Sequence, residues 1–382
     1  MKIGIICHPS IGGSGLVATQ LGIGLAKKGH EIHFVSEAMP FKLHGNEENI
    51  YFHPVEAISY PLFNYSLYAF ALTAKIIEVA EKYKLDIVHA HYSIPHSLCA
   101  HLAAEISTSR FKIITTIHGT DTTVVGLDKP LYPLNRYSIE RSDVVTTVSE
   151  YQKKHTLEQF QLNKAIEVIY NFIDPQVFNP QLASSEVRQT LASDDEKIIM
   201  HVSNFRQPKN TFGVIKTFAK VVGTINARLV LVGDGPDMPE IKTLCQSLGI
   251  IDKVNFLGKR KHLESIIPNA DCILQPSYHD SFGMVSLEAM ASGVPTVTSD
   301  REGVPEVVEH GVTGYTADPD DHETLAGYLV DICSNPELQT RMGENGRARA
   351  MEHFLWDSQV ETYLKCYENC LSDTVPGLPL SA

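Results

Sequence analysis

Strand-length apolar runs alternate with helical stretches along most of this chain, and this alternation constrains the fold more than any other feature. It is typical of parallel α/β sheets, in which each strand is followed by a helix that packs on the sheet. The alternation forms two series, separated by a pause around 171–175 and a polar segment up to about Glu196. A chain of 382 residues also exceeds what one core usually fills. The sequence therefore predicts two doubly wound α/β domains.

The apolar runs also give the positions of the expected elements. Strands are predicted at 2–7, 31–36, 50–55, 87–91, 113–118, 144–149, 166–170, 198–203, 228–233, 254–257, 272–275, 296–299 and 314–316. The clearest helices are predicted at 14–28, 66–83, 93–106 and 325–334, and the segment 337–371 follows the last of them. We place the domains at 1–174 and 175–354, and expect the last ten or so residues, with Pro376 and Pro379, to form a loose tail.

Charge and cysteine content exclude several classes of protein. The net charge of −13 argues against a general binder of nucleic acid or anionic membranes. No apolar run approaches the roughly 18 residues of a membrane span, and the N-terminus lacks the features of a signal peptide. The 7 cysteines contain no CxxC pair, and their odd number disfavours a complete disulfide framework. We expect a cytoplasmic protein without a membrane partner; the sequence leaves the oligomeric state open, with a homo-oligomer among the alternatives.

Two carboxylates bracket a turn that follows the predicted strand 272–275. These are Asp280 and Glu288, and the turn between them contains Ser281, Phe282 and Gly283. A turn that opens a helix presents backbone N–H groups and a positive dipole end, which suits a phosphate. The acids would repel that phosphate but can accept hydrogen bonds from sugar hydroxyls. The combination suggests binding of a nucleotide sugar and glycosyl transfer.

A glycine-rich turn follows the first strand at 10–15. Glycines here let the backbone approach a ligand closely, so an anion or sugar contact is one interpretation and a generic tight turn another. The spacing matches neither GxGxxG nor a Walker loop, and no acid ends the second strand, which disfavours a dinucleotide site. In open α/β sheets ligands bind beyond the carboxyl ends of the strands, where this turn lies.

Polar residues end two further strands of the first series. His118 and Thr120 follow one of them, where they can contact a sugar or an acceptor carboxylate, although His118 can also be a satisfied core histidine. Asp121 is a nucleophile, a positioning acid or only a helix N-cap. His89 and His91 end the other strand and have no partner at zinc spacing, so we expect no metal there.

Cationic residues follow the first strand of the second series. Arg206 and Lys209 lie in one loop and can neutralise a leaving diphosphate, or they can be ordinary surface charges. Gly233 ends the next strand, in a turn or a loop that lines the nucleotide. Another strand ends at 257–260, where backbone atoms near Arg260 can contact the edge of a base. The acidic patches at 194–195 and 318–321 lie in polar loops, so the sequence gives no support to a Mg²⁺-dependent diphosphate site.

In order and spacing these motifs resemble the retaining glycosyltransferases of family four, which have the GT-B fold. The motifs that carry the resemblance are Gly12–Gly15, His118, Arg206 with Lys209, 233–236 and 280–288. More narrowly, 7–15, 89–96, 118–121, 170–174 and 201–206 resemble the members that transfer GlcNAc from UDP-GlcNAc to the hydroxyl of L-malate in bacillithiol biosynthesis. The resemblance implies a GT-B fold whose C-terminal helix, 355–372, packs back on the first domain. It also implies front-face substitution without a metal or cofactor, in which the departing diphosphate accepts the proton of the malate hydroxyl.

The resemblance also implies roles for individual residues. Glu288 would hold the uridine ribose, Asp280 the donor sugar, and the amides of 282–285 the diphosphate. The implied catalytic residues are His118, Arg206, Lys209 and Asp280. The implied donor-binding residues are Gly15, Asn204, Gly233, Arg260, Ser281, Phe282, Gly283, Met284, Val285 and Glu288. The implied acceptor-binding residues are Ser14, Tyr92, Thr120 and Arg136, with Arg141 as the alternative arginine.

The sequence departs from the family pattern at two positions. Asp280 stands where the family has Glu, and Asn204 stands where it usually has Arg, so Arg206 would supply that charge by another path. Arg136 can instead pair with Glu140 one helical turn on. Three other functions remain open: a family-four transferase with another acceptor, a GT-B-fold UDP-GlcNAc epimerase, and a non-catalytic nucleotide-sugar-binding protein.

Overall fold

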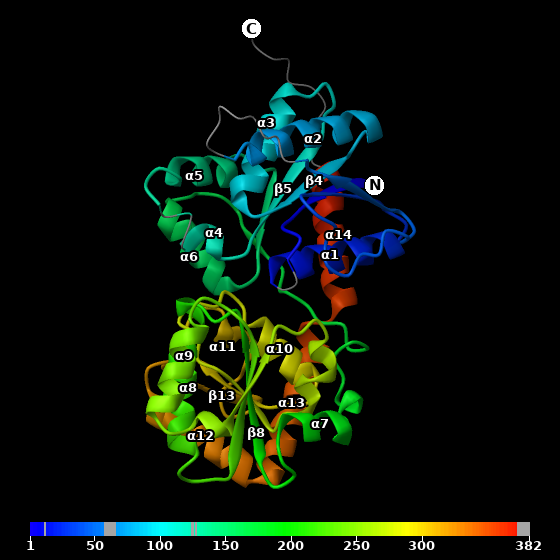
Figure 1. The fold of residues 1–382 in the computed structure, drawn as a ribbon. Coiled ribbons are helices and arrows are strands. Elements are labelled where there is room, and N and C mark those ends of the chain that lie inside the picture. The colour runs from blue at the N-terminus through cyan, green and yellow to red at the C-terminus, as the bar shows by residue number, and fades with distance from the viewer. Residues whose placement is uncertain (11–12, 57–65, 124–125, 127, 373–382) are drawn as a thin grey trace. The chain divides into compact units, whose positions relative to one another are not determined.

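The computed structural model describes residues 1–10, 13–56, 66–123, 126 and 128–372. Gly12 and the predicted tail at Pro376–Pro379 lie outside these residues. The chain divides into two compact units: Met1–Tyr170 with Asp357–Ala382, and Asn171–Trp356. Each unit contains one parallel sheet (Figure 1), so the predicted α/β class with two doubly wound domains is confirmed.

The N-terminal unit is built on a sheet with strand order β3-β2-β1-β4-β5-β6-β7. The strands are β1 Lys2–Ile6, β2 Glu31–Ser36, β3 Ile50–Pro54, β4 Ile87–His91, β5 Lys112–Ile117, β6 Val144–Thr147 and β7 Glu167–Val168. The helices are α1 Ser14–Lys27, α2 Tyr68–Tyr83, α3 Leu98–Ile106, α4 Thr120–Thr123, α5 Tyr132–Arg141, α6 Glu150–Phe160 and α14 Trp356–Ser372. Helices α2, α3 and α5 cover one face of this sheet and α1 and α14 the other (Figure 1).

The C-terminal unit is built on a sheet with strand order β10-β9-β8-β11-β12-β13. The strands are β8 Lys197–Ser203, β9 Ala227–Gly233, β10 Val254–Gly258, β11 Cys272–Gln275, β12 Thr296–Ser299 and β13 Gly314–Ala317. The helices are α7 Ser185–Leu191, α8 Thr211–Val221, α9 Met238–Ser247, α10 Met284–Ala291, α11 Val304–Val307, α12 His322–Ser334 and α13 Pro336–His353. Helices α8, α9 and α12 cover one face and α7, α10 and α13 the other (Figure 1).

Differences from the predicted elements are local. The last strand predicted in the first series, 166–170, contains only the two residues of β7. The helix predicted at 93–106 begins with a wide turn, Ser93–Ser97, in which Ile94 has extended backbone angles, and becomes regular only at Leu98. Pro95 lies in that turn and disfavours helical geometry at the residue before it.

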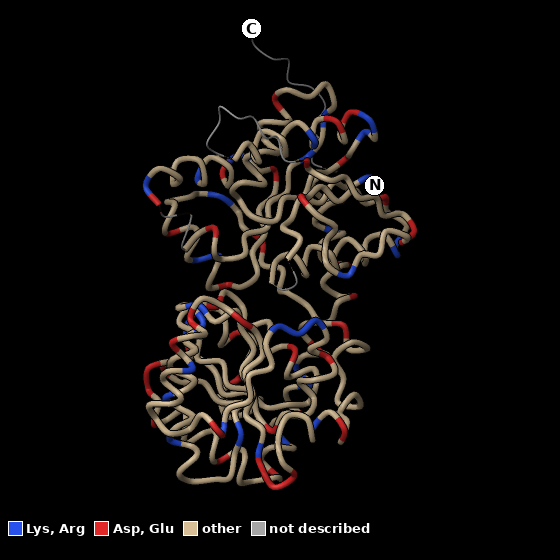
Figure 2. Tube along the Cα trace, in the orientation of Figure 1, with Lys and Arg blue, Asp and Glu red and all other residues tan. Residues whose placement is uncertain are grey.

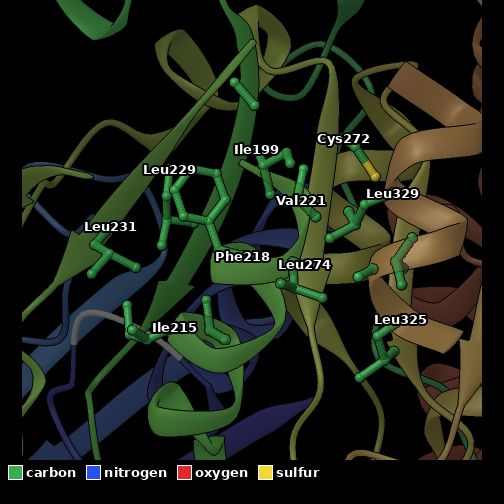
Figure 3. Close-up of a cluster of buried hydrophobic side chains, with 14 of the residues drawn as sticks. Ile199, Ile215, Phe218, Val221, Leu229, Leu231, Cys272, Leu274, Leu325 and Leu329 are labelled. Atoms are coloured by element: carbon green, nitrogen blue, oxygen red, sulfur yellow. The ribbon is translucent and has the colours of Figure 1, made fainter. Parts of the chain in front are cut away.

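The core of the C-terminal unit shows why the apolar pattern identified the sheet so well. Strand residues such as Ile199, Leu229 and Leu274 are fully buried against Phe218 of α8 and Leu329 of α12 (Figure 3). A strand covered on both faces is apolar at nearly every position, which produces the continuous runs seen in the sequence.

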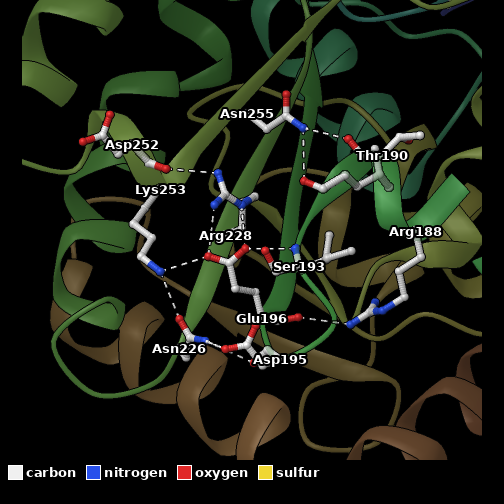
Figure 4. Close-up of polar contacts among 12 residues, drawn as sticks. Arg188, Thr190, Ser193, Asp195, Glu196, Asn226, Arg228, Asp252, Lys253 and Asn255 are labelled. Atoms are coloured by element: carbon white, nitrogen blue, oxygen red, sulfur yellow. Dashed lines mark hydrogen bonds and ion pairs between the residues drawn. The ribbon is translucent and has the colours of Figure 1, made fainter.

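Carboxylates hold the strands together at the amino end of the same sheet. Glu196 receives Arg228 Nε at 2.7 Å and Nη2 at 3.1 Å, and also Lys253 Nζ at 2.9 Å (Figure 4). The Ser193 amide donates to the same carboxylate at 3.1 Å. Next to it, Asp271 accepts from Arg188 at 3.0 Å and from the amide of Ile198 at 2.8 Å. These bonds join the starts of β8, β9 and β11.

Charges are interspersed along both units, with acidic and basic residues alternating over short distances (Figure 2). Among the described residues, no helix combines the length and the apolar character that a bilayer span requires.

Candidate active site

The carboxyl end of the C-terminal sheet brings together two residues that the sequence predicted as catalytic. Lys209 lies in the loop after β8 and Asp280 in the loop after β11, and these strands are neighbours in the sheet. Lys209 Nζ donates to Asp280 Oδ2 at 2.7 Å. The two loops are also joined through their backbones, because Pro208 O accepts from the amides of Tyr278 at 2.9 Å and His279 at 3.2 Å. The cation thus lies beside the first turn of α10.

Asp280 orders the turn that opens α10. Its Oδ1 accepts from the amide of Gly283 at 2.8 Å and lies 3.4 Å from that of Phe282. Gly283 has a φ of 94°, which favours glycine, and α10 begins at the next residue. Burial alone would raise the pKa of Asp280, but the Lys209 charge and these hydrogen bonds outweigh it, so the pKa lies below its ordinary value. The first-turn amides of α10, including those of Met284 and Val285, have no acceptor within the helix, as suits an anion site.

Arg206 lies beside Asn204, the residue that replaces the usual arginine. With the Asn204 amide oriented so that its oxygen faces the guanidinium, Oδ1 accepts from Arg206 Nε at 3.2 Å and from Nη2 at 2.6 Å. The neutral amide holds the guanidinium without neutralising it. Arg206 therefore retains a full charge in the same loop as Lys209.

Gly233 is required by the packing of two loops. A Cβ at Gly233 would lie 1.8 Å from Ser203 O, and one at Gly235 would lie 2.1 Å from Asn204 O. The loop after β9 therefore packs directly on the backbone that leads to Arg206. This close packing accounts for both glycines.

The remaining predicted donor residues differ in burial. Glu288 on α10 is buried, with 6% of its surface exposed, and Phe282 packs edge to face on Phe354 at a ring distance of 5.6 Å. Ser281 is half-buried, whereas Arg260, after β10, is exposed.

Three polar residues around the Lys209–Asp280 pair were not singled out from the sequence. The His279 ring bonds Glu302 in the loop after β12 at 2.7 Å, and the Tyr278 hydroxyl donates to Asp320 in the loop after β13 at 2.6 Å. Glu302 has a φ of 58°, an unusual conformation for a residue with a side chain. Tyr278 and His279 directly precede Asp280 in the sequence, which was an available signal, whereas Glu302 reaches the pair only through the fold.

In the N-terminal unit, four predicted residues lie together beyond the carboxyl ends of β1, β4 and β5. The Ser14 hydroxyl donates to the Tyr92 hydroxyl at 2.9 Å, and the nearby Thr120 side chain acts to lower the pKa of the Tyr92 phenol, against the larger effect of burial. The His118 ring lies 5.3 Å from the Tyr92 ring. Burial of the phenol is the main cause that raises the pKa of Tyr92, so it remains a hydroxyl at neutral pH.

Backbone geometry holds this cluster in place. Tyr92 has a φ of 91°, and such strained residues often occur at ligand sites. A Cβ at Gly15 would lie 2.4 Å from His8 O, so only glycine lets α1 begin so close to β1. Gly15 therefore positions the neighbouring Ser14.

Asp121 hydrogen-bonds backbone amides of its own loop and of the turn after β4. Its Oδ1 accepts from the amides of His118 at 3.2 Å and Gly119 at 3.0 Å, and its Oδ2 accepts from the amide of Ser93 at 3.1 Å. Burial raises its pKa to about 6 despite these bonds. Of the three predicted interpretations, these bonds favour a positioning acid that holds the backbone of His118.

Arg136 lies elsewhere, on the exposed part of α5. Its Nε and Nη2 both donate to Glu140 Oε1 at 3.0 Å, the surface pair that the sequence offered as the alternative. This geometry gives no support to an acceptor role for Arg136. Arg141, in the last turn of the same helix, is also exposed.

The histidines at the end of β4 are buried and bond to protein groups. His89 bonds Tyr367 and Thr116, and His91 bonds His118. In the part of the chain that the structure describes, no group of three or more His, Cys, Asp or Glu residues is arranged to hold a metal ion.

Comparison with known proteins gives matches over nearly the whole chain. Residues 11–177 match the family described as Glycosyltransferase Family 4, and residues 184–349 match Glycosyl transferases group 1. The chain is 44% identical over 377 residues to N-acetyl-alpha-D-glucosaminyl L-malate synthase of Bacillus anthracis, covering 99% of both chains. It is 25% identical to D-inositol 3-phosphate glycosyltransferase of Mycolicibacterium smegmatis, covering 95% of this chain and 87% of that protein.

Solved structures show the same fold. Anabaena HepE in complex with UDP and glucose superposes with a TM-score of 0.83 at 19% identity, covering 96% of this chain and 99% of that one. At this identity the likeness establishes the fold alone, which is GT-B.

Proposed function

Because this chain belongs to glycosyltransferase family 4, we propose that it transfers GlcNAc from UDP-GlcNAc to the hydroxyl of L-malate, with retention of the α configuration and without a metal. An identity of 44% over 99% of the B. anthracis L-malate synthase supports this choice of donor and acceptor. The enzyme class itself, a glycosyltransferase, follows from the family.

The observation that carries the proposal is the Lys209–Asp280 pair beside the first turn of α10. A diphosphate at this turn would accept from backbone amides and lie next to Lys209 and Arg206. As the glycosidic bond to the diphosphate breaks, negative charge develops on the leaving oxygen, and fixed cations and amides stabilise it there. Asp280 and Glu288 would accept from sugar and ribose hydroxyls.

The hydroxyl cluster of the N-terminal unit supplies the proposed acceptor contacts. Ser14, Tyr92 and Thr120 offer neutral donors to a malate carboxylate or hydroxyl, and His118 lies against Tyr92. Asp121 already bonds backbone amides, so it is a poor candidate for the general base. The proton of the malate hydroxyl would instead pass to the departing diphosphate, while the hydroxyl oxygen forms the new bond on the same face of the sugar.

The test measures UDP release from UDP-GlcNAc with and without L-malate. We expect malate-dependent release, an α-linked product by proton NMR, and full activity in EDTA. Release only with another acceptor, for example inositol phosphate, would restrict the assignment to the family. Malate-independent epimerisation would replace the transferase reaction, and loss of activity in EDTA would overturn the metal-free mechanism.

A further inference from the structure

A buried hydroxyl on α14 is bonded to the end of β4 across 278 residues of sequence. Tyr367 OH lies 2.7 Å from His89 Nδ1, and His89 Nε2 lies 2.7 Å from Thr116 Oγ1 on β5. Tyr367, His89 and Thr116 are all fully buried. Both ring nitrogens of His89 therefore have partners, and the ring cannot turn without breaking two hydrogen bonds.

His89 in turn supports a second histidine. Its ring lies 4.4 Å from the ring of His91, two residues further along β4, and His91 Nδ1 lies 2.9 Å from His118 Nε2. His118 contacts Tyr92, which bonds Ser14. A continuous series of contacts thus leads from α14 to the hydroxyl cluster. We call Tyr367, His89, His91 and His118 the histidine ladder.

The ladder is neutral at physiological pH. Burial, followed by the neighbouring histidines, lowers the pKa of His89 and of His118 to about 3, and that of His91 well below its ordinary value. Each ring therefore carries one proton, and the position of that proton decides which nitrogen donates.

The surroundings of His91 determine the direction of its bond to His118. Among the described residues, His91 Nε2 is buried and has no hydrogen-bond partner. A proton on this nitrogen would be an orphaned buried donor, which proteins avoid more strictly than an unused acceptor. The proton of His91 therefore belongs on Nδ1, where it donates to His118 Nε2.

We propose that Tyr367 and His89 are positioning residues that act through His91 to hold the His118 ring and to keep its proton on Nδ1. His118 would then offer a donor, and never an acceptor, at Nδ1. Helix α14 follows the C-terminal unit in sequence but belongs to the N-terminal unit. Through Tyr367 it would fix the ring and the proton of His118 in the candidate acceptor site. The kinetic consequence rests on the proposed function, whereas the position of the proton does not.

The test compares two buried tyrosines of α14. Tyr367→Phe removes the hydroxyl that bonds His89. Tyr363→Phe removes a hydroxyl that lies 3.5 Å from Thr116 Oγ1 and does not bond His89. In protein labelled with ¹⁵N-histidine, we expect wild type and Tyr363→Phe to show His118 protonated on Nδ1, and Tyr367→Phe to show a mixture of tautomers. For Tyr367→Phe alone, we expect kcat/KM for the acceptor to fall about tenfold, the lower end of the range for loss of an outer hydrogen bond at metal-ligating histidines.

A second variant covers the case in which Tyr367→Phe does not fold. His91→Phe keeps a ring in the stack but removes the donor to His118, so the proton of His118 should move toward Nε2. Identical His118 signals in the two tyrosine variants, or an unchanged Nδ1 proton in His91→Phe, would overturn the proposal. The NMR measurement needs no substrate, so a wild-type enzyme without malate-dependent UDP release would refute the proposed function and leave this test intact.

Discussion

The two ends of the C-terminal sheet each hold a carboxylate against cations, but they do so differently. At the amino end, Glu196 is 4% exposed and receives Arg228, Lys253 and the Ser193 amide, so both of its oxygens are used twice. At the carboxyl end, Asp280 is 24% exposed and, within the described part of the chain, pairs with one cation, Lys209, which is itself 29% exposed. At the amino end, protein donors already occupy both oxygens of Glu196. At the carboxyl end, Lys209 and Asp280 can exchange their bond for bonds to a ligand.

The comparison separates stability from activity within one sheet. A carboxylate with several bonds to fixed strand ends lowers the free energy of the folded state and has no freedom to bind a ligand. A single ion pair at a partly open strand end contributes less to stability, but its lysine can turn to an incoming phosphate while Asp280 keeps its bonds to the α10 turn. Variants at the two ends should therefore affect different measurements.

The largest effect is expected at the amino end. Glu196→Gln leaves the charges of Arg228 and Lys253 without their carboxylate and should lower the free energy of unfolding by about 3 kcal/mol, the lower end for breaking a buried ion pair. Urea unfolding measures this, and kcat/KM at low temperature should stay near wild type. Glu323→Gln on α12 is the matched control, because the Glu323 pair with Lys220 is exposed. Equal stability of the two variants would contradict the structural role of Glu196.

Lys209→Ala should lower activity and leave stability nearly unchanged, which is the reverse of Glu196→Gln. Loss of a charge-assisted contact to the diphosphate removes roughly 1.5–3 kcal/mol, so kcat/KM should fall well over tenfold while the unfolding midpoint changes little. Lys220→Ala, in the exposed pair on α8, is the control. Near-wild-type kinetics for Lys209→Ala would remove this lysine from the site.

Acid should weaken the amino-end network selectively. Burial would raise the pKa of Glu196, but Arg228, Lys253 and the Ser193 amide lower it from 4.5 to about 2. A depressed folded-state pKa gives stability that is present above pH 4.5 and is lost as the pH falls toward 2. The stability difference between wild type and Glu196→Gln should therefore shrink by about 1.4 kcal/mol between pH 7 and pH 3.5. A difference that stays constant over this range would show that the pKa of Glu196 is not depressed.

The same contrast explains what could be predicted from the sequence. Strands β8, β9 and β11 were the most predictable, because burial on both faces makes each of them an apolar run. Lys209 and Asp280 could be predicted to meet because carboxyl ends of neighbouring parallel strands share one edge. The bonds of Glu196 to Arg228 and Lys253, and of Tyr367 to His89, could not be predicted. These bonds join residues that are distant in sequence, and local sequence patterns do not reveal how such distant elements are aligned.

Asp280→Glu should have the smallest effect and sharpens the comparison most. Asp280 caps the Gly283 amide with one oxygen and binds Lys209 with the other, and both bonds suit a short side chain. An added methylene should weaken the cap by about 1 kcal/mol, which corresponds to roughly a fivefold loss in kcat/KM with little change in stability. Asp280→Asn, which keeps the length but not the charge, is the control and should lose more. Unchanged or higher activity in Asp280→Glu would mean that the sugar contact adapts to either acid, because a pocket built around the shorter side chain would lose activity.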